Sequence, residues 1–224
     1  MTVTIAEEVL LLAYSEDGMP LITWTQLDPA LAGAVLAELA IRGRVELSDE
    51  KVTLKDASPL GDAELDAVLA RIASESTGGK PVWWIQQLRS AELRGRLLSR
   101  LAESGVLSEQ REKAIIFTTT RWPEADPSVE GEVRDRVHSV LAGADPDART
   151  AALIAIAHAA KLDRRVFPEA SEQRINEIVT GAWAGDAVAR TVISIQAAAT
   201  AAAAAVIMAT TATATGTVTG VFPS

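Results

Sequence analysis

The sequence contains no cysteine and only two histidines among its 224 residues. Without thiols the chain has no disulfide bond, no Cys-ligated zinc and no cysteine nucleophile. The two histidines, His138 and His158, are too few for a His-rich metal site. We therefore expect no metal and no cofactor.

Aromatic residues are also scarce, at 4% of the chain, although 48% of the residues are hydrophobic. Much of the hydrophobic share is alanine, which loses no side-chain entropy in a helix. An all-β fold would need more β-branched and aromatic residues. A mean hydropathy of +0.16 excludes a disordered chain. The composition therefore predicts a mainly α fold.

Positive charge is in deficit, because 21 Lys and Arg residues face 30 Asp and Glu residues, for a net charge of −9. This balance argues against a nucleic-acid partner. The first residues lack the basic and apolar regions of a signal peptide, so we expect a cytoplasmic protein. The excess of Arg over Lys, together with the alanine content, indicates a GC-rich bacterial genome.

Capping and periodicity signals predict a series of helices in one domain. Thr4 and Glu7 match a capping box, and Asp28-Pro29 is typical of a cap followed by the first helical residue. The predicted helices cover 5–14, 29–42, 62–74, 90–104, 126–141, 150–160, 169–180 and 186–208, with a further helix around the Trp83-Trp84 pair. We expect a single domain at 1–208 and a low-complexity, disordered tail at 209–224.

Two short β-hairpins are predicted between the helices, near 45–54 and near 106–118. The second would pair Val106-Leu107 with the segment 114–118, around a charged tip at 108–113. Its apolar strand face either packs on the helices or forms an exposed element for membrane insertion or self-association. That face consists of Ile115, Ile116 and Phe117.

No charged residue follows Arg190. The apolar stretch 191–208 is close to the lower length limit of a membrane span. However, its alanines and threonines contribute little to insertion, and it lacks Leu and Phe. We favour a buried core helix, and a membrane anchor is the alternative.

The window 80–121 is basic, with eight basic and four acidic side chains. On a helical wheel Arg89, Arg96 and Arg100 form a solvated stripe, whereas Arg94 falls among the leucines of the apolar face. A guanidinium there is costly unless it meets an anion. Two alternatives stay open, a salt bridge to a core carboxylate and an anion site, for which phosphate is the natural match.

Signals of catalysis are weak. His158 lies in an apolar segment with no carboxylate within one turn, which favours a hydrogen-bonded core histidine. The sequence has no glycine-rich phosphate loop with Lys and Ser or Thr, and no HExxH motif. A helix-turn-helix regulator in the first 55 residues would lack suitable base-reading side chains. We therefore predict that the chain is not an enzyme.

Motifs spread over about residues 3 to 205 resemble the Golgi phosphoprotein 3 family. The segments that carry the resemblance are 4–12, 36–44, 58–66, 103–107, 119–123 and 149–158. The resemblance implies an apolar helical bundle surrounded by amphipathic helices, with one projecting β-hairpin. It also implies peripheral membrane binding through phosphatidylinositol 4-phosphate, and its eukaryotic members act as adaptors for the cytosolic tails of Golgi glycosyltransferases.

The headgroup pocket of that family uses four side chains. They are a Trp before the second helix, an Arg in the first turn of that helix, and two Args three residues apart on the helix before the hairpin. Trp24 matches the Trp, and Arg94 matches the second of the paired Args. The other two positions fall on Ala32 and Ala91.

By resemblance we expect a cytoplasmic, peripherally membrane-associated protein that binds an anionic phospholipid headgroup, with a possible membrane-protein client. The expected headgroup-binding residues are Trp24 and Arg94, with Arg89 and Arg96 near enough to compensate for the two alanines. Ile115, Ile116 and Phe117 would insert into the membrane or form a homo-oligomer. The alternative is a soluble, self-associating interaction protein that has lost phosphoinositide binding.

Overall fold

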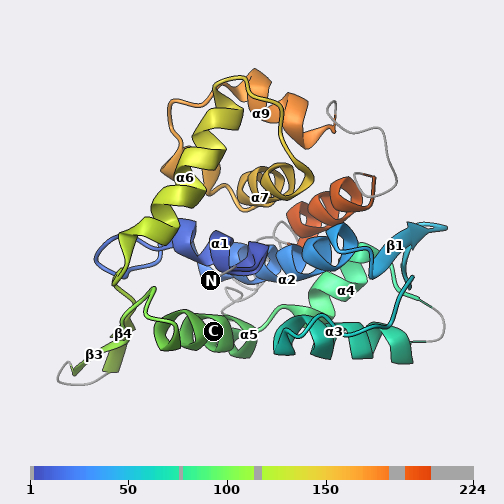
Figure 1. The fold of residues 1–224 in the computed structure, drawn as a ribbon, viewed down its shortest axis with the longest axis horizontal. Helices are drawn as coiled ribbons and strands as arrows, with labels where there is room; N and C mark the ends of the chain where they lie inside the picture. The colour runs from blue at the N-terminus through green and yellow to red at the C-terminus, as the bar shows by residue number, and fades with distance from the viewer. Residues whose placement is uncertain (1–2, 76–77, 114–117, 182–189, 203–224) are drawn as a thin grey trace, which may run out of the picture.

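Helices dominate the computed structural model, which describes residues 3–75, 78–113, 118–181 and 190–202 (Figure 1). The helices are α1 (Ile5–Ala13), α2 (Trp24–Ile41), α3 (Ala63–Ser74), α4 (Pro81–Leu88), α5 (Ala91–Glu103), α6 (Pro127–Leu141), α7 (Ala148–Ala159), α8 (Asp163–Val166) and α9 (Glu172–Val179). Residues 190–202 are also helical. The antiparallel hairpins pair β1 (Val45–Ser48) with β2 (Lys51–Leu54) and β3 (Gln110–Lys113) with β4 (Thr118–Arg121). The predicted mainly α fold with two small hairpins is confirmed.

Helices α1 and α2 form the centre of the fold. Every residue of α1 is buried, and α2 is buried almost throughout from Leu27 to Ala40. Figure 1 shows α3, α4 and α5 on one side of this pair and α6, α7 and α9 on the other. Helix α2 contacts α1, α3, α4, α5 and α7. The apolar core therefore extends from both central helices into both flanking layers.

The helical segment 190–202 packs on α2. Val192, Ile195 and Ala199 are buried, and a Cβ atom added to Gly33 of α2 would lie 3.3 Å from the Ala199 Cβ atom. Small residues thus allow a close approach of the two helices. The described part of the predicted C-terminal helix is thus a core helix, as favoured. Among the described residues, no helix is long and apolar enough to cross a membrane. The predicted tail at 209–224 lies outside the described residues.

Helix α2 begins at Trp24, five residues before the predicted start. Thr23 caps it, and the Gln26 side chain accepts a hydrogen bond from the Thr23 backbone N–H at 3.2 Å, which completes a capping box. The Asp28-Pro29 pair was wrongly interpreted as the cap, because Pro29 lies inside the helix. Asp28 is consequently a helical residue with its side chain available for a tertiary contact.

The second hairpin has a different register from the predicted one. Gln110 pairs with Arg121 and Lys113 with Thr118, so the segment predicted as the charged tip is itself a strand. Leu107 forms only an isolated bridge with Glu124. The threonines of β4 favour extended backbone and supply the partner strand. The hairpin projects from the helices (Figure 1); Ile115, Ile116 and Phe117 lie outside the described residues.

The buried carboxylate of Glu7 on α1 holds α5 in place. Glu7 is 1% exposed, and its Oε1 atom accepts a hydrogen bond from Arg100 Nε at 2.6 Å. Arg100 also donates to Asp62, the cap of α3, at 2.7 Å. The other oxygen of Glu7 accepts from the Thr4 backbone N–H at 2.7 Å. One ion-pair cluster therefore connects α1, α3 and α5.

Arg149 of α7 connects the two central helices through their buried glutamates. Its Nη1 atom lies 2.9 Å from Glu38 Oε2 on α2, and its Nη2 atom lies 3.1 Å from Glu8 Oε1 on α1. It also donates to the Val3 carbonyl oxygen. Glu8 and Glu38 are each at most 2% exposed. Removal of Arg149 would leave both carboxylates with fewer cations in the apolar centre.

We predict that Arg149→Met lowers the free energy of unfolding by about 3 kcal/mol, because the buried carboxylates of Glu8 and Glu38 each lose one of their two arginine partners. Urea denaturation followed by circular dichroism measures this value. Lys55→Gln is the control, since its pair with Glu46 is exposed and such pairs contribute about 1 kcal/mol or less. Equal losses in the two variants would contradict the prediction.

Candidate functional site

Trp24 and Arg94 lie in contact where α2 meets α5. The guanidinium carbon of Arg94 is 4.1 Å from the centroid of the Trp24 ring, a cation–π arrangement. The Arg94 side chain is 14% exposed, whereas Trp24 is 43% exposed. The structure thus brings together the two residues that matched the headgroup pocket, with the ring at the surface and the charge beneath it.

A carboxylate of the same chain already pairs with one nitrogen of the Arg94 guanidinium. Arg94 Nη1 forms a salt bridge with Asp28 Oδ1, and the Asp28 side chain is 18% exposed. Asp28 follows Trp24 by one helical turn, so both side chains face α5. Of the two open alternatives for Arg94, a salt bridge is the one observed, although its carboxylate lies at the edge of the core.

Tyr14 forms the apolar wall behind this cluster. Its ring centroid lies 6.5 Å from that of Trp24, and the residue is 5% exposed. Burial raises the pKa of Tyr14 to about 12, with Asp28 acting in the same direction and Arg94 against it. The Tyr14 phenol is therefore neutral over the physiological pH range.

Arg96 faces away from the Trp24–Arg94 contact, and Arg89 forms no ion pair or hydrogen bond with either residue of it. Arg96 is two residues after Arg94, about 200° around the helix, and it binds Glu64 of α3 through two hydrogen bonds of 2.6 and 2.9 Å. That hydrogen bonding raises the pKa of Arg96. Arg89 caps the end of α4 and is half-buried. No described residue forms an ion pair or hydrogen bond with the Arg89 side chain.

The two alanines that replace the family arginines occupy very different places. Ala32 is completely buried in the middle of α2, far from the first turn, where a guanidinium would be in the apolar core. Ala91 is exposed at the first position of α5, three residues before Arg94. Only the Ala91 position is therefore open to an arginine that could reach the surface beside Arg94.

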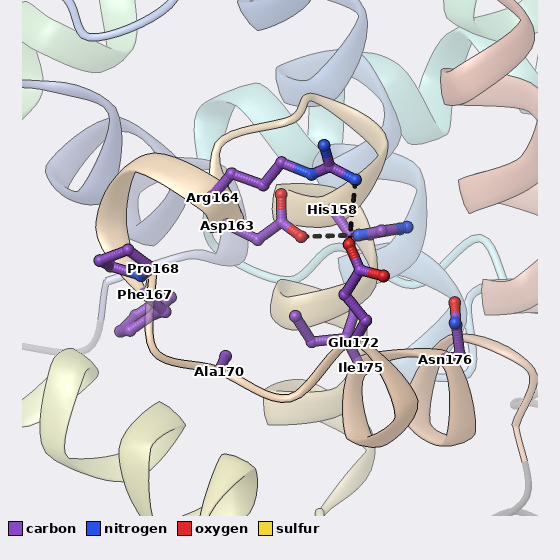
Figure 2. A pocket seen from close by; sticks show the side chains of 9 residues that line it. All are labelled: His158, Asp163, Arg164, Phe167, Pro168, Ala170, Glu172, Ile175 and Asn176. Carbon is purple, nitrogen blue, oxygen red and sulfur yellow. Dashed lines mark hydrogen bonds and ion pairs between the residues drawn. The ribbon is translucent and has the colours of Figure 1, made fainter.

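His158 forms a second polar centre, which the sequence interpretation missed. Its Nδ1 atom lies 2.7 Å from Asp163 Oδ2 (Figure 2). This hydrogen bond raises the pKa of His158, whereas burial acts in the opposite direction. The side chain is 35% exposed. The predicted hydrogen bond is therefore present. The predicted core position is wrong, because the imidazole ring of His158 is partly exposed. The chain turns back after α7 and brings Asp163 next to this ring.

Comparison with known proteins connects these observations to a family. A protein-family model described as Golgi phosphoprotein 3 (GPP34) matches residues 5–195. The chain is 27% identical over 208 residues to vacuolar protein sorting-associated protein 74 of Eremothecium gossypii. That match covers 74% of this chain and 62% of the relative. The chain therefore spans less than two thirds of the length of this relative.

Tyr14 is the only tyrosine in the chain, so a single ultraviolet titration reports on the Trp24–Arg94 cluster. We predict a phenol midpoint near 12 in the folded protein, against the ordinary 10.0. Because the folded pKa is raised, the stability linked to Tyr14 is complete below pH 10.0 and is lost as the pH approaches about 12. Circular dichroism verifies that the chain is still folded. A folded-state midpoint near 10.0 would exclude this environment for the phenol.

Proposed function

The chain belongs to the Golgi phosphoprotein 3 family, and on this premise we propose that it is a peripheral membrane protein that binds an anionic phospholipid headgroup through Arg94 and Trp24. The family resemblance favours phosphatidylinositol 4-phosphate as the lipid. The name of the relative, a vacuolar protein sorting-associated protein, suggests an adaptor role for membrane-protein clients. The function proposed is binding, without catalysis.

The observation that carries the proposal is the Arg94 guanidinium, stacked on an exposed Trp ring and paired with an oxyanion. Within the described residues, Asp28 is the only side chain that forms an ion pair with Arg94, and it binds Nη1. A guanidinium has five N–H donors in a planar fork that suits phosphate oxygens. Trp24 offers an apolar ring with a polar N–H, a combination suited to a membrane interface. A headgroup phosphate would share or replace the Asp28 contact.

The β3–β4 hairpin supplies the proposed second membrane contact. It projects away from the helices (Figure 1), and the sequence between its strands contains Ile115, Ile116 and Phe117. We propose that these apolar residues insert into the bilayer or pair with a second copy of the chain. Insertion would orient the protein on the membrane, while Arg94 would supply the recognition of the headgroup.

Opposite effects are expected from the two partners of the salt bridge. Arg94→Gln removes a charged contact to the headgroup and should weaken binding about tenfold or more. Asp28→Asn removes the competing carboxylate and should strengthen binding several-fold. Co-flotation with vesicles containing phosphatidylinositol 4-phosphate, against phosphatidylcholine vesicles, measures both. If Asp28→Asn weakens binding as much as Arg94→Gln, the pair has only a structural role.

An arginine at Ala91 tests whether the open position next to Arg94 belongs to the site. Ala91→Arg should strengthen vesicle binding about tenfold, because a second guanidinium can contact the same phosphate. Ser99→Arg is the matched control, since it adds the same charge at another exposed position of α5. Equal gains in the two variants would indicate general attraction to an anionic surface.

Flotation of the wild-type protein distinguishes lipid binding from the alternative of a soluble, self-associating interaction protein. If the protein fails to float with every anionic lipid at low salt, lipid binding is lost as an explanation. Concentration-dependent mass, compared between the wild type and Phe117→Asp, then tests self-association through the hairpin. A Phe117→Asp protein that still floats and still associates would leave the hairpin without either role.

A further inference from the structure

A polar hollow lies on the opposite layer from Arg94, beside the end of α7. Two adjoining pockets, of about 490 and 370 Å³, share His158, Asp163 and Arg164 in their linings. Figure 2 shows the larger pocket, with α9 residues Glu172, Ile175 and Asn176 on one side. The smaller pocket extends to Lys161 and to the helical segment 190–202. Both volumes are within the range of small-molecule pockets, about 300–1,000 Å³.

Lys161 is held in a conformation that favours glycine. Its φ angle is +58°, in the left-handed region at the residue that terminates α7. The backbone N–H groups of Lys161 and Leu162 donate to the carbonyl oxygens of His158 and Ala157, each at 2.9 Å. A side chain at this position therefore carries a backbone cost that glycine would avoid. No described residue forms an ion pair or hydrogen bond with the Lys161 ammonium group, which lines the smaller pocket.

The His158–Asp163 pair fixes a positive group in the same place. The Asp163 side chain is 6% exposed, and His158 binds its Oδ2 atom. In the part of the chain that the structure describes, the buried Oδ1 atom has no hydrogen-bond partner. A buried carboxylate with one hydrogen-bonded partner favours the charged imidazolium form of that partner. Figure 2 shows the second ring nitrogen of His158 pointing away from Asp163. That nitrogen has no partner among the described residues.

Neutral polar side chains complete the lining. Gln196 is only 7% exposed, and within the described residues its side-chain amide forms no hydrogen bond, although its atoms stay open to the smaller pocket. The amide can therefore donate to and accept from a ligand in the hollow. Asn176 presents a second amide at the larger pocket. Hydroxyl groups of a ligand are suitable partners for both amides.

The charged side chains that line the hollow indicate that the ligand carries an acidic group. Asp163 balances His158, and Glu172 faces Arg164 at 3.3 Å in a pair whose side chains are 73% and 84% exposed. So exposed a pair is weak, and Arg164 can turn to another anion. With His158, Lys161 and Arg164 positive and Asp163 and Glu172 negative, the hollow keeps one net positive charge for a ligand. A phosphomonoester carries about −1.5 to −2 at neutral pH.

We propose that this hollow binds a phosphorylated polyol, with His158, Lys161 and Arg164 around the phosphate and the amides of Gln196 and Asn176 near the hydroxyl groups. The site is independent of the proposed headgroup contact at Arg94. The phosphate belongs either to a soluble sugar phosphate or to an inositol phosphate headgroup.

The two histidines of the chain make the site directly observable by NMR. His158 reports on the hollow, and His138 serves as an internal reference near Glu169. Titration of the full chain with glucose 6-phosphate should give a saturable shift of the His158 ring protons and no comparable shift of His138. Glucose alone should give no shift. A shift of both histidines without saturation would overturn the proposal.

Lys161→Gly separates binding from folding. Glycine relieves the positive φ angle, so the variant should unfold at the same or a higher urea concentration than the wild type. Its affinity for glucose 6-phosphate should fall about tenfold or more. Lys55→Gln, which removes the same charge at the distant β1–β2 hairpin, should change the affinity less than about twofold. An unchanged affinity in Lys161→Gly would overturn the proposal.

The source of the phosphate follows from a parallel titration with vesicles containing phosphatidylinositol 4-phosphate. A response to glucose 6-phosphate supports a soluble ligand, and a response to the vesicles alone supports a headgroup. No His158 response to either probe overturns the site. Arg94→Gln distinguishes the two proposals, because it should reduce vesicle flotation while leaving the response of His158 to glucose 6-phosphate unchanged.

Discussion

The interaction on which the rest of the structure depends is the pairing of buried glutamates with arginines from surrounding helices. Glu7, Glu8 and Glu38 lie in the most apolar part of the molecule, where each charge requires a cation at hydrogen-bond distance. Arg100 and Arg149 meet this requirement from α5 and α7. The relative placement of four helices therefore follows from satisfying three carboxylates.

The same ion pairs give a structural meaning to the sequence segments that resemble the family. The segments 4–12, 36–44 and 149–158, which carried the resemblance, contain the three glutamates and Arg149. They describe the centre of the fold and contribute nothing to the Trp24–Arg94 contact. Arg100 fixes the rotation of α5, and that rotation directs Arg94 toward α2 and Arg96 toward Glu64 of α3. The candidate site thus depends on the ion pairs in the core without sharing residues with them.

Local signals in the sequence predicted most helices, because their determinants lie within a few residues. Asp62, Ser90 and Asp126 cap α3, α5 and α6, and they are the first residues of the predicted ranges 62–74, 90–104 and 126–141. The start of α2 was missed because two cap signals compete, and the Thr23–Gln26 box prevails over Asp28-Pro29. The helical wheel identified Arg94 as misplaced among leucines, but its partner Asp28 lies 66 residues away. Such a contact depends on tertiary packing, as does the turn that brings Asp163 back to His158.

The salt bridge between Asp28 and Arg94 would also determine which kind of ligand the proposed headgroup contact distinguishes. A carboxylate on the same chain is present at a high effective concentration that no dilution of the protein reduces. An anion that replaces the Asp28 contact on Arg94 competes with this carboxylate, so a single dissolved phosphate would be at a disadvantage. A membrane presents many headgroups at once and holds them next to the protein after the first contact. For the proposed headgroup contact, the internal competitor would therefore make surface density, more than the concentration of free ligand, the quantity to which Arg94 responds.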